Sequence, residues 1–117
     1  MGKLTTHVLD TAHGRPGAGI AVELFKLDGD TRRSLSRVVT NDDGRCDKPL
    51  LEGDALRVGE YELVFHVGEY FAAAGVRVPE PRFIDRVVLR FGVADAAEHY
   101  HVPLLVSPWA YSTYRGS

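Results

Sequence analysis

The sequence of 117 residues contains a single cysteine, Cys46. A lone thiol excludes an intramolecular disulfide and is too few for a cysteine-based metal site, so we expect a reducing compartment, the cytoplasm. The sequence also lacks an apolar run near the roughly 18 residues of a membrane-spanning helix, and its first residues lack the apolar stretch of a signal peptide. We therefore expect neither export nor a membrane partner.

An excess of charge of either sign is also missing. Lys and Arg number 14 against 16 Asp and Glu, which gives a net charge of -2. Nucleic-acid binding is not expected, because it requires a basic patch or stripe. Hydrophobic residues make up 44%, the proportion of a folded globular protein. The length fits one domain, 1–117.

Amphipathic helical stripes are nearly absent, and the dominant hydrophobic period is two. Short alternating runs separated by turn residues at intervals of roughly 8 to 12 predict an all-β sandwich or barrel. In 61–67 the odd positions are apolar, so Glu62 and His66 are expected to point away from the core. The stretch 69–75 favours a short helix closed by a glycine. The predicted strands cover 4–9, 20–27, 35–40, 61–67, 84–93, 99–106 and 111–114, with a further short edge strand at 54–57.

The first predicted strand carries a candidate for chemistry, His7. Alternation places Thr5, His7 and Leu9 on one face of this strand. An imidazole held on a strand is suited to proton transfer near neutral pH. The competing interpretation is a surface histidine without a function, since sandwiches often expose one sheet face to solvent.

Arg45 is the second candidate, because it directly follows the turn at 41–44. A guanidinium held at the end of a turn can bind an anionic oxygen. The competing interpretation is a solvated ion pair with Asp42, Asp43 or Asp47.

His99 and His101 lie two residues apart and so project from the same side of a strand. Together with His7 they would supply three nitrogen ligands, enough for a catalytic zinc ion with an open position. The alternative is a metal-free pair, with one working histidine and one structural histidine. The sequence has no other metal-ligand cluster, which favours the metal-free pair.

The last four residues, Tyr114, Arg115, Gly116 and Ser117, form a polar tail directly after an apolar strand. Chain termini are usually frayed. A tail this rich in hydrogen-bonding groups nevertheless indicates burial in a site or an interface.

Several of these segments resemble the 5-hydroxyisourate hydrolases, the enzyme branch of the transthyretin-like fold. The resemblance extends over nearly the whole chain. Its most specific mark is the ending Tyr-Arg-Gly-Ser, which the transthyretin carriers lack together with the catalytic histidines. The matching segments are 4–10, 43–45, 99–105 and 114–117.

The resemblance implies a transthyretin-like sandwich of two four-stranded sheets with one short helix, assembled as a homotetramer. It implies catalytic roles for His7, Arg45, His101 and Ser117, and leaves His99 as the structural histidine. It also implies that Tyr114, Arg115 and Gly116 shape the substrate pocket.

The implied reaction is hydrolysis of 5-hydroxyisourate to 2-oxo-4-hydroxy-4-carboxy-5-ureidoimidazoline in urate degradation. A histidine would activate water and an arginine would bind the substrate, with neither metal nor cofactor. A transthyretin-type carrier without catalysis is the alternative. A serine nucleophile is disfavoured because no Gly-x-Ser-x-Gly turn exists, and an adhesion module because paired cysteines are absent.

Overall fold

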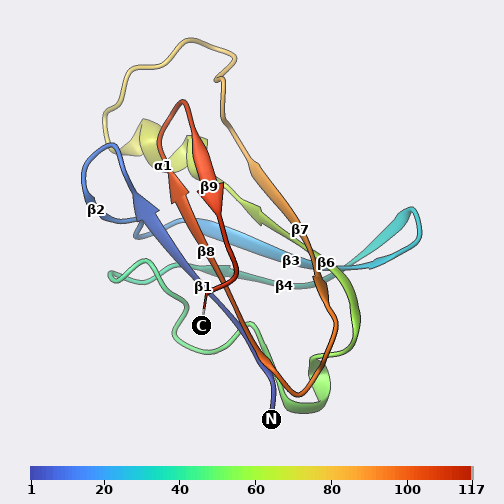
Figure 1. Cartoon of the computed structure of the whole chain (residues 1–117). Helices are drawn as coiled ribbons and strands as arrows, with labels where there is room; N and C mark the ends of the chain where they lie inside the picture. The colour runs from blue at the N-terminus through green and yellow to red at the C-terminus, as the bar shows by residue number, and fades with distance from the viewer. Residues whose placement is uncertain (117) are drawn as a thin grey trace.

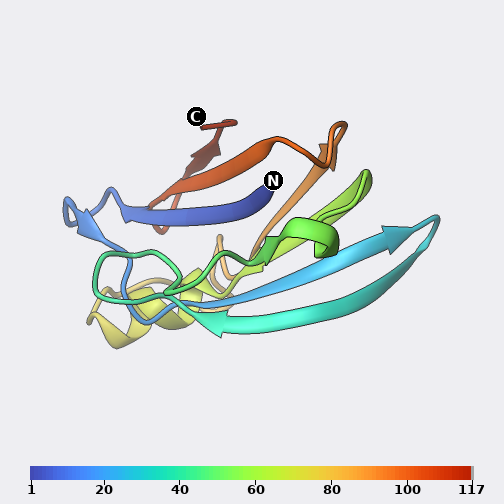
Figure 2. The same cartoon turned by 90° about the horizontal axis from the view of Figure 1, so that it is seen from below.

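The computed structural model describes residues 1–116, in which two β-sheets pack face to face (Figure 1; Figure 2). The first sheet has the order β2-β1-β8-β9, with β5 also paired to β1, and the second has the order β4-β3-β6-β7. The bounds of the first sheet are β1 Lys3–Asp10, β2 Arg15–Pro16, β5 Leu51–Glu52, β8 His99–Val106 and β9 Tyr111–Thr113. Those of the second are β3 Ala21–Asp28, β4 Thr31–Val39, β6 Gly59–Phe65 and β7 Val87–Val93, and the helices are η1 Gly53–Ala55 and α1 Val67–Ala73.

The hydrophobic core lies between the two sheets. Along β1 every second residue is buried, and Leu4 and Val8 are fully enclosed in the core. The alternating residues, including Thr5 and His7, stay partly accessible on the outer face of the first sheet. The alternation predicted for this strand is therefore confirmed, and it leaves one face free for chemistry.

The central strand β6 departs from its predicted pattern. Its odd positions do face the core, but Glu62 and His66 are both 7% exposed and not solvated. The His66 ring is hydrogen-bonded to Glu23 of β3 at 2.7 Å, and Arg90 of β7 approaches Glu62 at 3.8 Å. Side chains of the neighbouring strands thus cover the second face, an effect of tertiary packing that strand alternation does not reveal.

Other element boundaries also differ from the sequence predictions. The edge strand predicted at 54–57 is wrong: the strand is β5, and a 3-10 turn follows it. β4 begins at Thr31, before its predicted start, because it pairs with β3 through the hairpin at 28–31. The two-residue strand β2 was not predicted, and with β5 it brings the first sheet to five strands where four were expected. The helix at 67–73 begins two residues before its predicted start.

Parallel pairing of β1 with β8 gives the first sheet its functional layout. The register places Thr5 opposite His101 and His7 opposite Pro103. Two segments about 95 residues apart in the sequence therefore present their outward side chains on one surface, visible as the blue and red strands lying side by side (Figure 2). Within residues 1–116, none of the helices has the length and apolar character needed to cross a membrane.

Candidate active site

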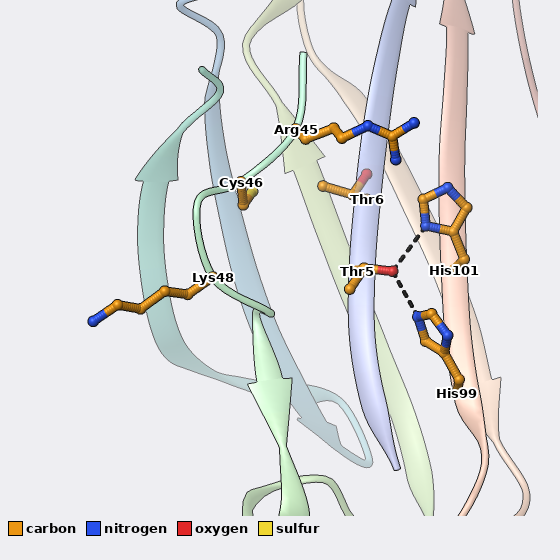
Figure 3. A pocket seen from close by; sticks show the side chains of 7 residues that line it. All are labelled: Thr5, Thr6, Arg45, Cys46, Lys48, His99 and His101. Atoms are coloured by element: carbon orange, nitrogen blue, oxygen red, sulfur yellow. Dashed lines mark hydrogen bonds between the residues drawn. The ribbon is translucent and has the colours of Figure 1, made fainter. Parts of the chain in front are cut away.

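A hydroxyl from β1 joins the two histidines of β8. Thr5 Oγ1 lies 2.8 Å from Nδ1 of His101 and 2.9 Å from Nε2 of His99 (Figure 3). Both rings come from the same side of β8, as their spacing predicts; the parallel register places Thr5 opposite His101, and its hydroxyl reaches both rings. Alternation along β1 places Thr5 on the face of His7, but nothing in the local sequence marks Thr5 as part of a site.

This group forms one wall of a cavity of about 260 Å³. The volume is just below the roughly 300 to 1,000 Å³ of typical small-molecule pockets, so it suits a compact ligand. Basic groups dominate the lining, and the lining residues are Thr5, Thr6, Arg45, Cys46, Lys48, His99 and His101. Lys48 and Cys46 were not anticipated as lining residues, because nothing in their local sequence marks them; in Figure 3 the Lys48 ammonium points away from the histidines.

The turn before Arg45 is fixed by the side chain of Asn41. Its Oδ1 accepts the backbone N–H groups of Asp43 and Arg45, each at 3.0 Å, and its Nδ2 donates to Asp47 at 2.9 Å. Within residues 1–116, no carboxylate lies within ion-pair distance of the Arg45 guanidinium. Figure 3 shows that guanidinium directed toward the His101 ring. The predicted ion pair with a neighbouring aspartate is therefore wrong.

Gly44 brings this turn against β1. Its φ of +74° is left-handed, and a Cβ would lie 2.4 Å from the carbonyl oxygen of Val8. The Gly44 carbonyl in turn accepts the Val8 N–H at 2.8 Å, and Arg45 forms a β-bridge with His7. Glycine is needed here because its φ is positive and because a side chain would collide with the Val8 carbonyl oxygen. The close approach that it allows places Arg45 beside His7 on β1.

His7 and His101 share one electrostatic environment. Burial lowers the pKa of His7, and the positive charge of Arg45 lowers it further. Burial also lowers the pKa of His101, followed by the charges of Arg45, His99 and His7. Both rings are therefore held in the neutral form around pH 7, the state in which an imidazole nitrogen accepts a proton.

The C-terminal tail reaches this site through Gly116. Its N–H donates to the His101 carbonyl at 2.8 Å, and a Cβ on Gly116 would lie 2.6 Å from Cδ2 of the His101 ring. Tyr114 and Arg115 instead border a second cavity of about 440 Å³ between β7 and β8. Arg115 lies over the Tyr100 ring at 4.1 Å and donates to the His99 carbonyl at 3.2 Å. Ser117, the remaining predicted catalytic residue, lies outside the described residues.

A zinc ion was the alternative use of these histidines. Over the described part of the chain, 1–116, no three His, Cys, Asp or Glu side chains are grouped to hold a metal ion. Nε2 of His99 and Nδ1 of His101 are both within hydrogen-bond distance of the Thr5 hydroxyl. The arrangement thus offers neutral proton acceptors, a fixed cation and a hydroxyl, which together suit metal-free activation of water.

The chain is similar to known proteins over nearly its whole length. The sequence model of the HIUase/Transthyretin family matches residues 4–116. A protein of Ralstonia nicotianae named 5-hydroxyisourate hydrolase is 65% identical over the full length of both chains. The crystal structure of (S)-allantoin synthase matches with a TM-score of 0.94 and 47% sequence identity. The match covers 99% of the present chain but only 44% of the synthase chain. The crystal structure of sea bream transthyretin in complex with thyroxine matches with a TM-score of 0.86 and 22% sequence identity. The match covers 97% of the present chain and 94% of the transthyretin chain, and at this identity it shows the shared fold alone.

Proposed function

The chain belongs to the HIUase/Transthyretin family, and on that basis we propose that it hydrolyses 5-hydroxyisourate to 2-oxo-4-hydroxy-4-carboxy-5-ureidoimidazoline, a step of urate degradation. The whole chain, 1–117, acts as one hydrolase domain. The observation that carries the proposal is the cavity in which neutral His101, paired with Thr5, faces Arg45. Relatives named for this activity over their full length support it.

Water activation is assigned to the two histidines that have a lowered pKa. One of His7 and His101 removes a proton from water as its oxygen attacks a ring carbonyl carbon. The other protonates the ring nitrogen as the carbon–nitrogen bond breaks and the six-membered ring opens. General acid–base catalysis of this kind contributes roughly 10²- to 10⁴-fold. Burial and the charge of Arg45 lower the pKa of both rings, which favours the neutral form that accepts a proton.

Arg45 supplies the fixed positive charge of the reaction. Its guanidinium binds the anionic oxygens of the substrate and stabilises the negative charge that develops on the attacked carbonyl oxygen. Loss of such a stabilising group commonly costs about 3 kcal/mol in the barrier. Since the turn of Asn41 and Gly44 holds the Arg45 backbone in place, little reorganisation accompanies the reaction.

The tail is proposed to complete the site. Gly116 packs on His101 and fixes the orientation of its ring, while Arg115 holds the start of β8 through the His99 carbonyl and Tyr100. Tyr114 and Arg115 shape the substrate pocket, and Ser117 is proposed to position the water or a histidine through its hydroxyl. No metal or organic cofactor takes part in these steps.

A carrier of transthyretin type is the second candidate, favoured only by the shared fold. Carrier pockets are lined mainly by apolar side chains with a few polar groups. In this cavity four of the seven lining residues, Arg45, Lys48, His99 and His101, bear cationic or basic groups. Such a lining favours a small polar substrate over a hydrophobic ligand.

The decisive experiment follows the ultraviolet absorbance of urate freshly oxidised by uricase. The protein is expected to accelerate the decay of the intermediate, and His101→Asn and Arg45→Gln are each expected to reduce that acceleration by at least about 10²-fold. Activity is expected to survive treatment with a chelator. A wild-type protein that leaves the decay unchanged would refute the proposed hydrolase, and chelator-sensitive activity would favour zinc.

We further propose that the protein is a cytoplasmic homotetramer. β7 and β9 are edge strands that border the same 440 Å³ cavity, so two unpaired sheet edges lie on one side of the molecule. Exposed aromatic side chains, including Phe83 at 74% and Trp109 at 56%, add apolar surface. Sedimentation equilibrium is expected to give about four times the chain mass of 12.9 kDa, and fractionation should recover the protein with cytoplasmic markers.

A further inference from the structure

The Thr5 hydroxyl has an unusual pair of partners. A hydroxyl has one proton to donate and two lone pairs to accept with. Thr5 Oγ1 is within hydrogen-bond distance of a ring nitrogen of both His99 and His101. When both rings are neutral, Thr5 can donate to one of them only, so the other must donate its N–H to Thr5.

This constraint couples the tautomers of the two histidines. If Nδ1 of His101 carries the proton and donates to Thr5, then Thr5 donates to Nε2 of His99, and Nε2 of His101 is a free base. If the chain of hydrogen bonds reverses, His99 donates to Thr5, Thr5 donates to Nδ1 of His101, and Nε2 of His101 carries a proton as an acid. A general base and a general acid therefore differ only in the direction of two hydrogen bonds.

We propose that Thr5 and His99 form a proton relay behind His101, a role that rests on the proposed hydrolytic function. When Nε2 of His101 takes a proton from water, its Nδ1 proton moves to Thr5 Oγ1 and the Thr5 proton moves to Nε2 of His99. His101 is then neutral and protonated on Nε2, and His99 carries the positive charge. When His101 gives up its Nε2 proton to His7, which protonates the leaving nitrogen, the two relay protons return and restore the starting state.

The charges around the cavity favour moving the proton in this direction. Figure 3 shows the Arg45 guanidinium beside His101, with His99 beyond it along β8. A positive charge on His99 is therefore farther from Arg45 than the same charge on His101, which reduces the repulsion. His99 is exposed to solvent, whereas His101 is half-buried, so hydration also stabilises the charge on His99. The other charged or titratable groups near the pair are Cys46 and Lys48 of the cavity lining, with the Lys48 ammonium directed away, and His7, whose charge acts on His101. Glu98 and Arg115 lie beside His99.

His99 is accordingly a positioning and relay residue, not the purely structural member of the pair that the resemblance implied. Two matched variants separate these roles. Thr5→Val keeps the shape of the side chain and removes the hydroxyl, while Thr5→Ser keeps the hydroxyl. His99→Gln keeps an amide N–H that can donate to Thr5 but cannot accept a proton.

The uricase-coupled assay measures kcat and KM for each variant over a range of pH. The relay predicts a fall in kcat of about 10- to 100-fold for Thr5→Val and for His99→Gln, with KM little changed. Thr5→Ser should stay within about threefold of wild type, and the double variant Thr5→Val/His99→Gln should lose no more than either single variant. The acidic limb of the kcat profile should move to lower pH in Thr5→Val, since protonated His101 loses its acceptor.

The outcomes distinguish the relay from the proposed function. If the wild type is active and His99→Gln keeps full kcat, the relay is wrong while the hydrolase stands. Additive losses in the double variant would also overturn it. If the wild type itself is inactive, the hydrolase fails first. Nitrogen-15 spectra of the histidine rings give a check independent of turnover, because Thr5→Val should change the tautomer populations of both His99 and His101.

Discussion

Four of the five histidines of this protein fall into two environments. His13 and His66 each contact a carboxylate at 2.7 Å, Asp10 and Glu23 respectively. His7 and His101 instead lie near Arg45, and over residues 1–116 neither has a carboxylate within ion-pair distance. A carboxylate holds the ring of His13 or His66 in place through a hydrogen bond, whereas the Arg45 cation lowers the pKa of His7 and His101 and favours their neutral form. The surroundings thus separate the histidines that stabilise the fold from those suited to proton transfer.

Asp10, the carboxylate that contacts His13, accepts hydrogen bonds from several groups at once. Its buried carboxylate accepts the Tyr70 hydroxyl at 2.7 Å, the His13 ring at 2.7 Å and the N–H groups of Ala12 and His13 at 3.0 Å. Burial opposes ionisation, but these hydrogen bonds prevail and lower the pKa of Asp10. The network joins the end of β1 to α1, and it leaves no acceptor free for catalysis.

The largest expected effect is a loss of kcat/KM in His7→Asn that His13→Asn does not show. Removing His7 should reduce kcat/KM by about 10²- to 10⁴-fold, because a proton-transfer group is lost. Removing His13 should leave kcat/KM within a few-fold of wild type and lower the melting temperature instead. Both are measured with the uricase-coupled assay and thermal unfolding. Equal losses of activity in the two variants would abolish the distinction between the environments.

Asp10→Asn is expected to destabilise the fold without removing the chemistry. A neutral amide cannot accept all of the hydrogen bonds of the carboxylate, and a buried hydrogen bond to a charged group is worth about 2 kcal/mol. Urea unfolding should show a loss of about that size. The loss should be present at neutral pH and shrink as the pH falls through the carboxyl pKa range, because the lowered pKa of Asp10 stabilises the native state only above it. An unchanged unfolding midpoint would contradict the prediction.

Glu23→Gln removes the carboxylate that contacts His66 and is expected to lower the free energy of unfolding by less than Asp10→Asn does. The Glu23 side chain is about a quarter exposed, so solvent screens its pair with the His66 ring. The hydrogen bond from His66 lowers the pKa of Glu23, which means that the pair stabilises the protein above about pH 4.5 and less below it. Urea unfolding should show a loss of about 0.5 to 1 kcal/mol with kcat unchanged.

The smallest expected effect is a shift in pH dependence. Because Arg45 lowers the pKa of both His7 and His101, the residual activity of Arg45→Gln should have its acidic limb at higher pH than the wild type. Arg45→Lys keeps the charge and serves as the matched control, with its limb close to that of the wild type. The two profiles are compared at one ionic strength. An unchanged acidic limb would show that burial alone sets the pKa of these rings.

The sequence predicted the fold class and much of this layout for reasons visible in particular residues. Alternation placed Thr5 and His7 on one face, spacing placed His99 and His101 on one side of a strand, and both arrangements are confirmed. The register that sets Thr5 opposite His101 was not predictable, since pairing between distant strands is decided by tertiary packing. For the same reason, neither the contact of Thr5 with both histidines nor the burial of His66 can be predicted from the local sequence.

The parallel pairing of β1 with β8 also has a consequence for synthesis. Thr5 is separated from its two imidazole partners by 94 and 96 positions along the sequence, so a nascent polypeptide emerging from the ribosome carries only part of this cavity until β8 has been synthesised. Closing such a long loop is slow compared with forming local hairpins. Turnover during refolding should therefore appear only after the hairpin sheet β3–β4 has acquired its protected amides.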